Sequence, residues 1–132
     1  MKGIFLIVFL HCTAALEYAS KTTFRNAIKG NKITFVNYGA PWCGHCQLLR
    51  ETWDELVADK ENIEDVTLLA INCEELETMC GEMNIETYPA LVAYKNGAEI
   101  ERYPIHAPRS EIALKAALRQ YAEDAKPQLV GW

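Results

Sequence analysis

Basic residues are scarce in this sequence relative to acidic ones. Lys and Arg number 13 against 18 Asp and Glu, which gives a formal net charge of −5. A surface with this balance has no cationic face for a phosphate backbone or for an anionic membrane. We therefore expect no nucleic-acid partner.

Long hydrophobic runs are absent as well. The most apolar stretch, Ile4 to Leu10, is shorter than the ~20 residues that cross a bilayer as a helix. Lys2 precedes it and the small residues Thr13-Ala14-Ala15 follow, which is typical of a secretory signal peptide cleaved after Ala15. An uncleaved anchor is the alternative. We expect no membrane association once residues 1–15 are removed.

Two of the cysteines are closely spaced. The chain has five, and cleavage after Ala15 would remove Cys12 and leave four, an even number that suits an oxidising compartment. Cys43 and Cys46 are separated by two residues. Such a pair can close a small disulfide ring, or it can present one thiol for attack and a second for resolution. This spacing therefore predicts a reversible two-electron switch.

The place of these cysteines in the predicted elements gives them different roles. The apolar run Ile33-Thr34-Phe35-Val36 predicts a strand, and a helical pattern begins at Cys43. Unpaired backbone N–H groups and the helix dipole favour a thiolate at such an end, so we expect Cys43 to be the exposed, attacking thiol. Cys46 would lie one turn further, more shielded and with a higher pKa, and would resolve.

Strands and helices alternate along the rest of the chain. Apolar runs predict strands, and 3.6-residue periodicity with capping residues predicts helices. The strands are expected at Lys32–Tyr38, Asp65–Ile71, Ala90–Tyr94 and Glu99–Tyr103, and the helices at Ser20–Lys29, from Cys43, at Glu74–Met83 and after the cap Ser110. Asn96-Gly97 suits the positive φ values of a type I′ turn between the last two strands.

This order of elements predicts a single α/β domain. With 132 residues, half of them hydrophobic, the chain can bury one core but has no room for two. We expect a mixed sheet with helices on both faces over residues 16–125, followed by a loosely held tail at 126–132. In the helix from Cys43, the residues on one stripe are expected to face the core: Leu49, Trp53, Leu56 and Val57.

The segment Ala40-Pro41-Trp42-Cys43-Gly44-His45-Cys46 resembles the active site of the protein disulfide isomerase family, within the thioredoxin fold. Thr87-Tyr88-Pro89 matches the cis-proline loop of that family, Asn96-Gly97 matches its hairpin, and the resemblance covers roughly Thr22 to Tyr121. It implies a thiol-disulfide oxidoreductase that forms, reduces or rearranges disulfides in secretory-pathway proteins. It also implies no cofactor and no metal.

The resemblance assigns roles around the two thiols. Trp42, Tyr88 and Pro89 would contact substrate, with the Tyr88-Pro89 bond cis and the backbone beside it free to pair with an extended substrate strand. Gly44 and His45 belong to the catalytic motif. By stabilising the Cys43 thiolate, His45 would make the disulfide more oxidising.

Three further residues are assigned by the same resemblance. Arg109 has the spacing of the family's mobile arginine, which swings towards the buried cysteine and lowers its pKa. A plain surface arginine is the alternative. Some domains of the family carry a structural disulfide at the spacing of Cys73 and Cys80, so we expect one here. Two buried free thiols are the alternative.

One departure from the family concerns a buried charge pair. The family's buried acid falls on Asn37 and its partner lysine on Ala70, so both charges are missing together. This is physically coherent, because losing one alone would leave an uncompensated buried charge. The acid normally helps to take the proton from the second cysteine. We therefore expect Cys46 to lose its proton more slowly here.

Other function classes fit less well. A zinc module built from Cys43, Cys46, Cys73 and Cys80 fits poorly, because structural sites usually pair closely spaced ligands from two loops and six residues separate Cys73 from Cys80. A redox-inactive peptide-binding module usually lacks one or both thiols, and a thioredoxin-like reductase is the alternative among enzymes.

The expected partners of the monomer are cysteine-containing client polypeptides and glutathione or an upstream oxidase. The ending Val130-Gly131-Trp132 is not a retention tetrapeptide, so we expect either the endoplasmic reticulum lumen or secretion.

Overall fold

The computed structural model describes residues 17–59, 63 and 65–127. The expected signal peptide and the end of the expected tail lie outside the described residues. In these ranges, no helix is both long enough and apolar enough to cross a membrane.

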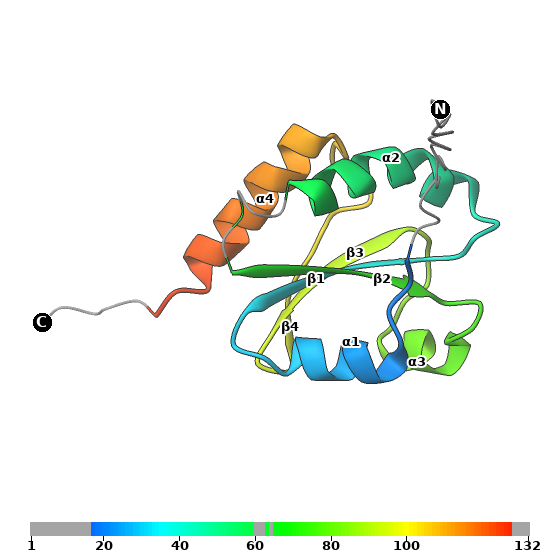
Figure 1. Cartoon of the computed structure of the whole chain (residues 1–132), viewed down its shortest axis with the longest axis horizontal. Coiled ribbons are helices and arrows are strands. Elements are labelled where there is room, and N and C mark those ends of the chain that lie inside the picture. The colour runs from blue at the N-terminus through cyan, green and yellow to red at the C-terminus, as the bar shows by residue number, and fades with distance from the viewer. Residues whose placement is uncertain (1–16, 60–62, 64, 128–132) are drawn as a thin grey trace, which may run out of the picture.

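A four-stranded mixed sheet forms the middle layer (Figure 1). Its strands lie in the order β2 (Val66–Asn72), β1 (Ile33–Gly39), β3 (Ala90–Lys95) and β4 (Ala98–Arg102). β1 is parallel to β2 and antiparallel to β3, and β4 is antiparallel to β3. Every residue of β1 is buried, which explains why its sequence is apolar without alternation.

Helices cover both faces of this sheet. Figure 1 shows α1 (Lys21–Ile28) and α3 (Glu77–Glu82) below it, and α2 (Gly44–Ala58) and α4 (Glu111–Asp124) above it. Alternate residues of β1 point to opposite sides: Tyr38 packs with Phe24 of α1, and Phe35 packs with Trp53 of α2. The predicted mixed sheet with two helical layers is confirmed.

Local side-chain chemistry explains where several elements begin and turn. Ser20 Oγ accepts a hydrogen bond from the Thr23 N–H at 3.1 Å, and Ser110 Oγ accepts one from the Ala113 N–H at 3.2 Å. Both serines therefore cap helices as predicted. Asn96 and Gly97 have φ values of 53° and 79°. These values confirm the predicted turn between β3 and β4.

Two details differ from the sequence-based expectation. α3 begins at Glu77 rather than Glu74, because Asn72 Oδ1 accepts the Glu74 N–H at 3.0 Å and holds the preceding residues in a turn. Val57 is 37% exposed and lines a hollow beside β2, so it does not belong to the core stripe. Trp53, as predicted, is fully buried.

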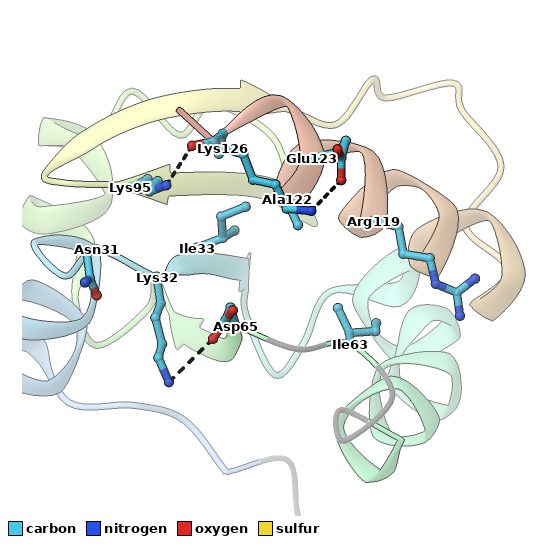
Figure 2. A pocket seen from close by; sticks show the side chains of 11 residues that line it. Asn31, Lys32, Ile33, Ile63, Asp65, Lys95, Arg119, Ala122, Glu123 and Lys126 are labelled. Atoms are coloured by element: carbon cyan, nitrogen blue, oxygen red, sulfur yellow. Dashed lines mark hydrogen bonds and ion pairs between the residues drawn. The ribbon is translucent and has the colours of Figure 1, made fainter. Parts of the chain in front are cut away.

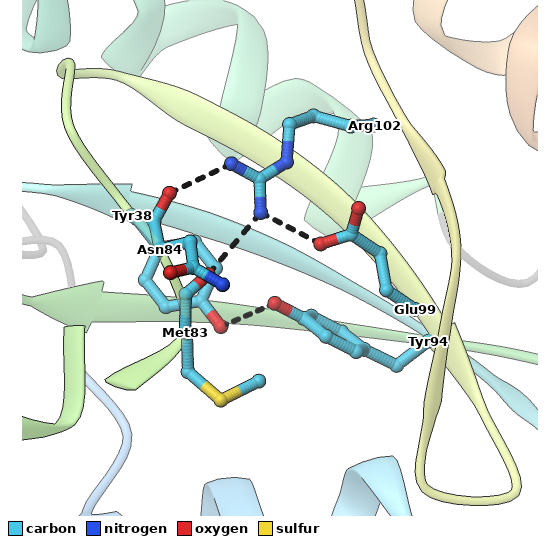
Figure 3. Close-up of polar contacts among 6 residues, drawn as sticks. All are labelled: Tyr38, Met83, Asn84, Tyr94, Glu99 and Arg102. Atoms are coloured by element: carbon cyan, nitrogen blue, oxygen red, sulfur yellow. Dashed lines mark hydrogen bonds and ion pairs between the residues drawn. The ribbon is translucent and has the colours of Figure 1, made fainter. Parts of the chain in front are cut away.

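A polar cluster joins β4 to the chain after α3 (Figure 3). Arg102 donates to the carbonyl oxygens of Met83 at 3.2 Å and Asn84 at 2.9 Å, and it pairs with Glu99 at 2.6 Å. Beneath it, the hydroxyl groups of Tyr38 and Tyr94 are hydrogen-bonded at 2.7 Å, and burial raises the pKa of both. The cluster therefore fixes the start of the segment that leads to Pro89.

An open cavity of about 710 Å³ lies where β1 begins, at the opposite end of the strand from the cysteine pair (Figure 2). Four basic side chains line it, and three of them have a hydrogen-bond or ion-pair acceptor. Lys32 pairs with Asp65 at 4.0 Å, Lys126 pairs with Glu123 at 2.7 Å, and Lys95 donates to the Ala125 carbonyl at 2.8 Å. Four basic side chains and two acidic ones line the cavity, so its formal charge is positive.

Candidate active site

The two free thiols lie where β1 passes into α2. β1 ends at Gly39, and Cys43 is the N-cap of α2 with extended backbone angles. Its Sγ takes the place of a capping oxygen and accepts the Cys46 N–H at 3.2 Å. The Cys43 sulfur therefore lies against the partial positive charge at the first turn of the helix.

Cys46 occupies a different environment one turn into the helix. Burial raises the pKa of its thiol to about 12, and a hydrogen bond with Cys43 adds to this shift. A hydrogen bond with the Ala40 backbone and the charge of Arg109 act in the opposite direction. The Cys46 thiol is therefore protonated at neutral pH, as a resolving thiol was expected to be.

Exposure of the two whole residues does not follow our expectation. Cys43 is 7% exposed and counts as buried, whereas Cys46 is partly exposed. The expectation of an exposed Cys43 is therefore wrong at the level of the whole residue.

The loop before β3 lies beside this pair. Its Tyr88-Pro89 peptide bond is cis, and Pro89 is buried. The Tyr88 ring contacts the Trp42 ring edge to face, with centroids 6.2 Å apart. Trp42 is itself 66% exposed. The three residues expected to contact substrate are therefore brought together next to Cys43.

Arg109 approaches the same site from the start of α4. It lines a small cavity that Pro89 and Ile105 also line, and its charge lowers the pKa of Cys46. The Tyr103 hydroxyl donates to the carbonyl of Pro108 and so fixes this proline, which directly precedes Arg109. The Arg109 Nε is buried without a hydrogen-bond partner among the described residues. Gly44 and His45, by contrast, are exposed on the first turn of α2.

Cys73 and Cys80 form a disulfide, with their Cα atoms 5.8 Å apart. Both residues are buried in the core between the sheet and α1 and α3. Because their sulfurs are bonded to each other, they are not available as thiolates to the zinc site considered above. Among the described residues, no three His, Cys, Asp or Glu side chains form a group able to hold a metal ion.

Asn37 and Ala70 face each other in the sheet. They are register partners of the parallel strands β1 and β2, and both are buried. Neutral residues thus stand at the two positions where the resemblance would place an acid and a lysine. None of the groups that principally shift the Cys46 pKa is a carboxylate.

Sequence reasoning missed two residues beside Cys46. A Cβ atom added to Gly39 would lie only 2.8 Å from the Cys46 Sγ, so the sulfur sits directly against this glycine. A glycine inside an apolar strand signals such close approach and could have been used. The pKa of Tyr18 is raised first by burial and then by the charge of Cys46. No pattern in the sequence pointed to Tyr18.

Comparison with known proteins agrees with this geometry. The thioredoxin family profile matches residues 15–120. "Probable protein disulfide-isomerase ER-60" of Schistosoma mansoni is 33% identical over 74% of this chain and 20% of its own length. "Protein disulfide isomerase-like 5-1" of Oryza sativa subsp. japonica is 27% identical over 93% of this chain and 84% of its own length.

A solved structure resembles most of this chain. The first two thioredoxin domains of Eps1p from Naumovozyma dairenensis match with a TM-score of 0.73 at 27% identity, over 83% of this chain and 42% of that one. The chain spans about a fifth of the length of the first curated relatives. The sheet and its two helical layers are those of the thioredoxin fold, and the chain belongs to the thioredoxin family.

Proposed function

We propose that this protein is a thiol-disulfide oxidoreductase of the protein disulfide isomerase kind, acting through Cys43 and Cys46. The observation that carries the proposal is the asymmetry of the two free thiols. The Cys43 sulfur caps α2, and the Cys46 thiol is desolvated and protonated at neutral pH. One thiol is thereby suited to attack and the other to resolve.

The exchange proceeds in two balanced steps. In the oxidising direction, a client thiolate attacks Cys43 Sγ of the Cys43–Cys46 disulfide. A mixed disulfide forms, and Cys46 leaves as a thiolate that takes up a proton. A second client thiolate then attacks the client sulfur of the mixed disulfide, and Cys43 leaves as a thiolate. Two electrons pass from the client to the protein, and the reverse sequence reduces a client disulfide.

Cys46 must lose its proton whenever it resolves a mixed disulfide. Asn37 cannot take that proton, because an amide is not a base at neutral pH. Arg109 lowers the pKa of Cys46 by its charge and so favours the thiolate. We therefore assign Arg109 the role of promoting resolution, and we expect this step to limit turnover.

Clients are expected to be polypeptides that contain cysteine. The exposed Trp42 and the adjoining Tyr88 offer apolar surface beside Cys43, and the backbone next to Pro89 could pair with an extended client strand. His45 would raise the oxidising power of the pair. The names of the relatives support an isomerase rather than a reductase.

The cellular compartment is inferred from the sequence. We infer that residues 1–15 are a signal peptide, that residues 16–125 form the domain, and that the protein works in the secretory pathway. A Cys73–Cys80 disulfide suits that oxidising compartment. Glutathione or an upstream oxidase would restore the Cys43–Cys46 disulfide. Whether the protein stays in the endoplasmic reticulum or is secreted can be determined by locating the tagged full-length chain in cells.

The experiment that tests this function is the refolding of reduced, denatured ribonuclease in a glutathione buffer. Wild-type protein should speed the recovery of ribonuclease activity, and the variant Cys43→Ser, Cys46→Ser should leave it at the buffer rate. Recovery that is the same with both proteins would contradict the proposal. Insulin reduction by dithiothreitol is run in parallel. A protein that acts only as a reductase would catalyse insulin reduction without speeding the refolding of ribonuclease.

A further inference from the structure

Gly39 separates the reactive pair from the buried disulfide. Its φ lies outside the left-handed region, so the backbone there does not require glycine. Space does require it. An added Cβ would lie 2.8 Å from Cys46 Sγ, closer than real Cβ atoms approach a sulfur, and the next nearest atom, Cys46 Cβ, would be 3.5 Å away. A larger residue at this position would force the Cys46 sulfur or the end of β1 to shift.

The backbone of Gly39 is tied to the disulfide. Its carbonyl oxygen accepts the Cys73 N–H at 2.8 Å, and Gly39 is the register partner of Asn72. Cys73 is bonded to Cys80, and the two residues are only 1% and 2% exposed. The place of the strand end beneath Cys46 therefore depends on a covalently fixed neighbour.

A second connection runs from the disulfide to the loop on the other side of the site. The Cys80 carbonyl accepts the Ile85 N–H at 3.0 Å, and Ile85 begins the segment that leads to Tyr88 and Pro89. Tyr88 contacts Trp42, the residue before Cys43. The Cys73–Cys80 bond thus joins the two backbone segments between which the reactive thiols lie.

We propose that Gly39 is a positioning residue for Cys46 and that the Cys73–Cys80 disulfide keeps it in place. The proposal rests on the proposed function, because positioning matters through the attack of Cys46 on a mixed disulfide at Cys43. That attack requires aligned sulfur atoms, and a misplacement of about 1 Å can slow a reaction on the order of 100-fold. The buried disulfide therefore contributes to the chemistry of the site as well as to the stability of the fold.

A double-mutant cycle on stability tests the contact itself without any activity. Gly39→Ala is introduced into the reduced wild type and into Cys46→Ala, and the urea midpoint of each protein is measured. We expect Gly39→Ala to lower the midpoint clearly more in the wild type, because the alanine at 46 has no sulfur to collide with. The matched control is Gly81→Ala, since no atom lies within 4 Å of its added Cβ. Equal losses in both backgrounds would overturn the proposal.

Kinetics of a glutathione mixed disulfide at Cys43 test the consequence. Gly39→Ala should slow its resolution by Cys46 roughly 10-fold to 100-fold, while alkylation of Cys43 and the resolution rate of Gly81→Ala stay at wild-type values. The double variant Cys73→Ala, Cys80→Ala, which lacks the buried disulfide, should slow the same step. If that variant does not fold, Cys73→Val, Cys80→Ala, which restores part of the lost volume, takes its place.

Two results would refute the positioning role. One is wild-type resolution in a folded variant that lacks the buried disulfide or carries Gly39→Ala. The other is an equal slowing of Cys43 alkylation and of resolution, which would indicate general damage to the site. Neither readout depends on a client protein. A wild type that fails to refold ribonuclease would therefore contradict the proposed function and leave this test intact.

Discussion

Cys46 is the residue at which the environment of the site acts most strongly. Its thiol is desolvated by α2 and the end of β1, it shares a hydrogen bond with Cys43, and no acid stands at Asn37 to take its proton. The spacing of the two cysteines predicts a resolving role for it. A glycine in an apolar strand indicates a close approach, but which group contacts Gly39 depends on how a strand end and a helix meet in space.

The pH dependence of resolution follows from this environment. Because burial, which persists in a mixed disulfide at Cys43, raises the pKa of Cys46 above the usual thiol range, the rate at which it resolves a glutathione mixed disulfide should still be rising with pH at pH 9. Stopped-flow measurement of glutathione release checks this. A plateau near pH 7 would contradict the assignment.

The same shift makes a prediction about stability. A folded-state pKa above the unfolded value near 9 favours the folded, reduced protein fully below pH 9, and this advantage is lost as the pH rises towards 12. Reduced wild type should therefore lose stability above pH 9 faster than Cys46→Ala does. Urea unfolding at several pH values measures the difference, and parallel curves would be evidence against it.

Arg109 acts on the same thiol through its charge. Arg109→Ala should raise the pKa of Cys46 further and slow reoxidation of the reduced protein, by roughly tenfold for each unit of added shift, with alkylation of Cys43 unchanged. Arg119→Ala, within α4 but at the distant cavity, is the matched control. Equal reoxidation rates in the two variants would identify Arg109 as a plain surface residue.

The elements of the fold each bring one part of the site into place. β1 supplies Gly39, α2 begins at the capping sulfur of Cys43, and α4 begins just after Arg109. Apolar runs and capping serines predicted these elements closely. The start of α3 was misplaced because a hydrogen bond from the Glu74 N–H to the side-chain oxygen of Asn72 outweighed helical periodicity there.

The two capping serines give a test at this scale. Ser110→Ala and Ser20→Ala each remove one acceptor from a helix N-terminus, so each should cost about 1 kcal/mol in the free energy of unfolding. Only Ser110→Ala should also slow reoxidation, because only α4 adjoins Arg109. If both variants reoxidised at the same rate, the link between the α4 cap and the site would be lost.

The whole molecule separates its reactive end from its polar end. The dithiol lies where β1 ends, and the charged cavity lies where β1 begins (Figure 2). The order of elements was enough to predict the fold class, and the Cys43-Gly44-His45-Cys46 motif singled out the two cysteines that are free thiols in the structure. The burial of Cys43 was not predicted, because it depends on packing between segments that are distant in the sequence.

Trapping of a client on single-cysteine variants tests the central claim most directly. Each variant, Cys46→Ala and Cys43→Ala, is incubated with scrambled ribonuclease, quenched with acid and run on a non-reducing gel. Cys46→Ala should accumulate a disulfide-linked complex, because Cys43 attacks and nothing resolves the product, and Cys43→Ala should accumulate none. A complex that forms on Cys43→Ala as readily as on Cys46→Ala would contradict the assignment of Cys43 as the attacking thiol.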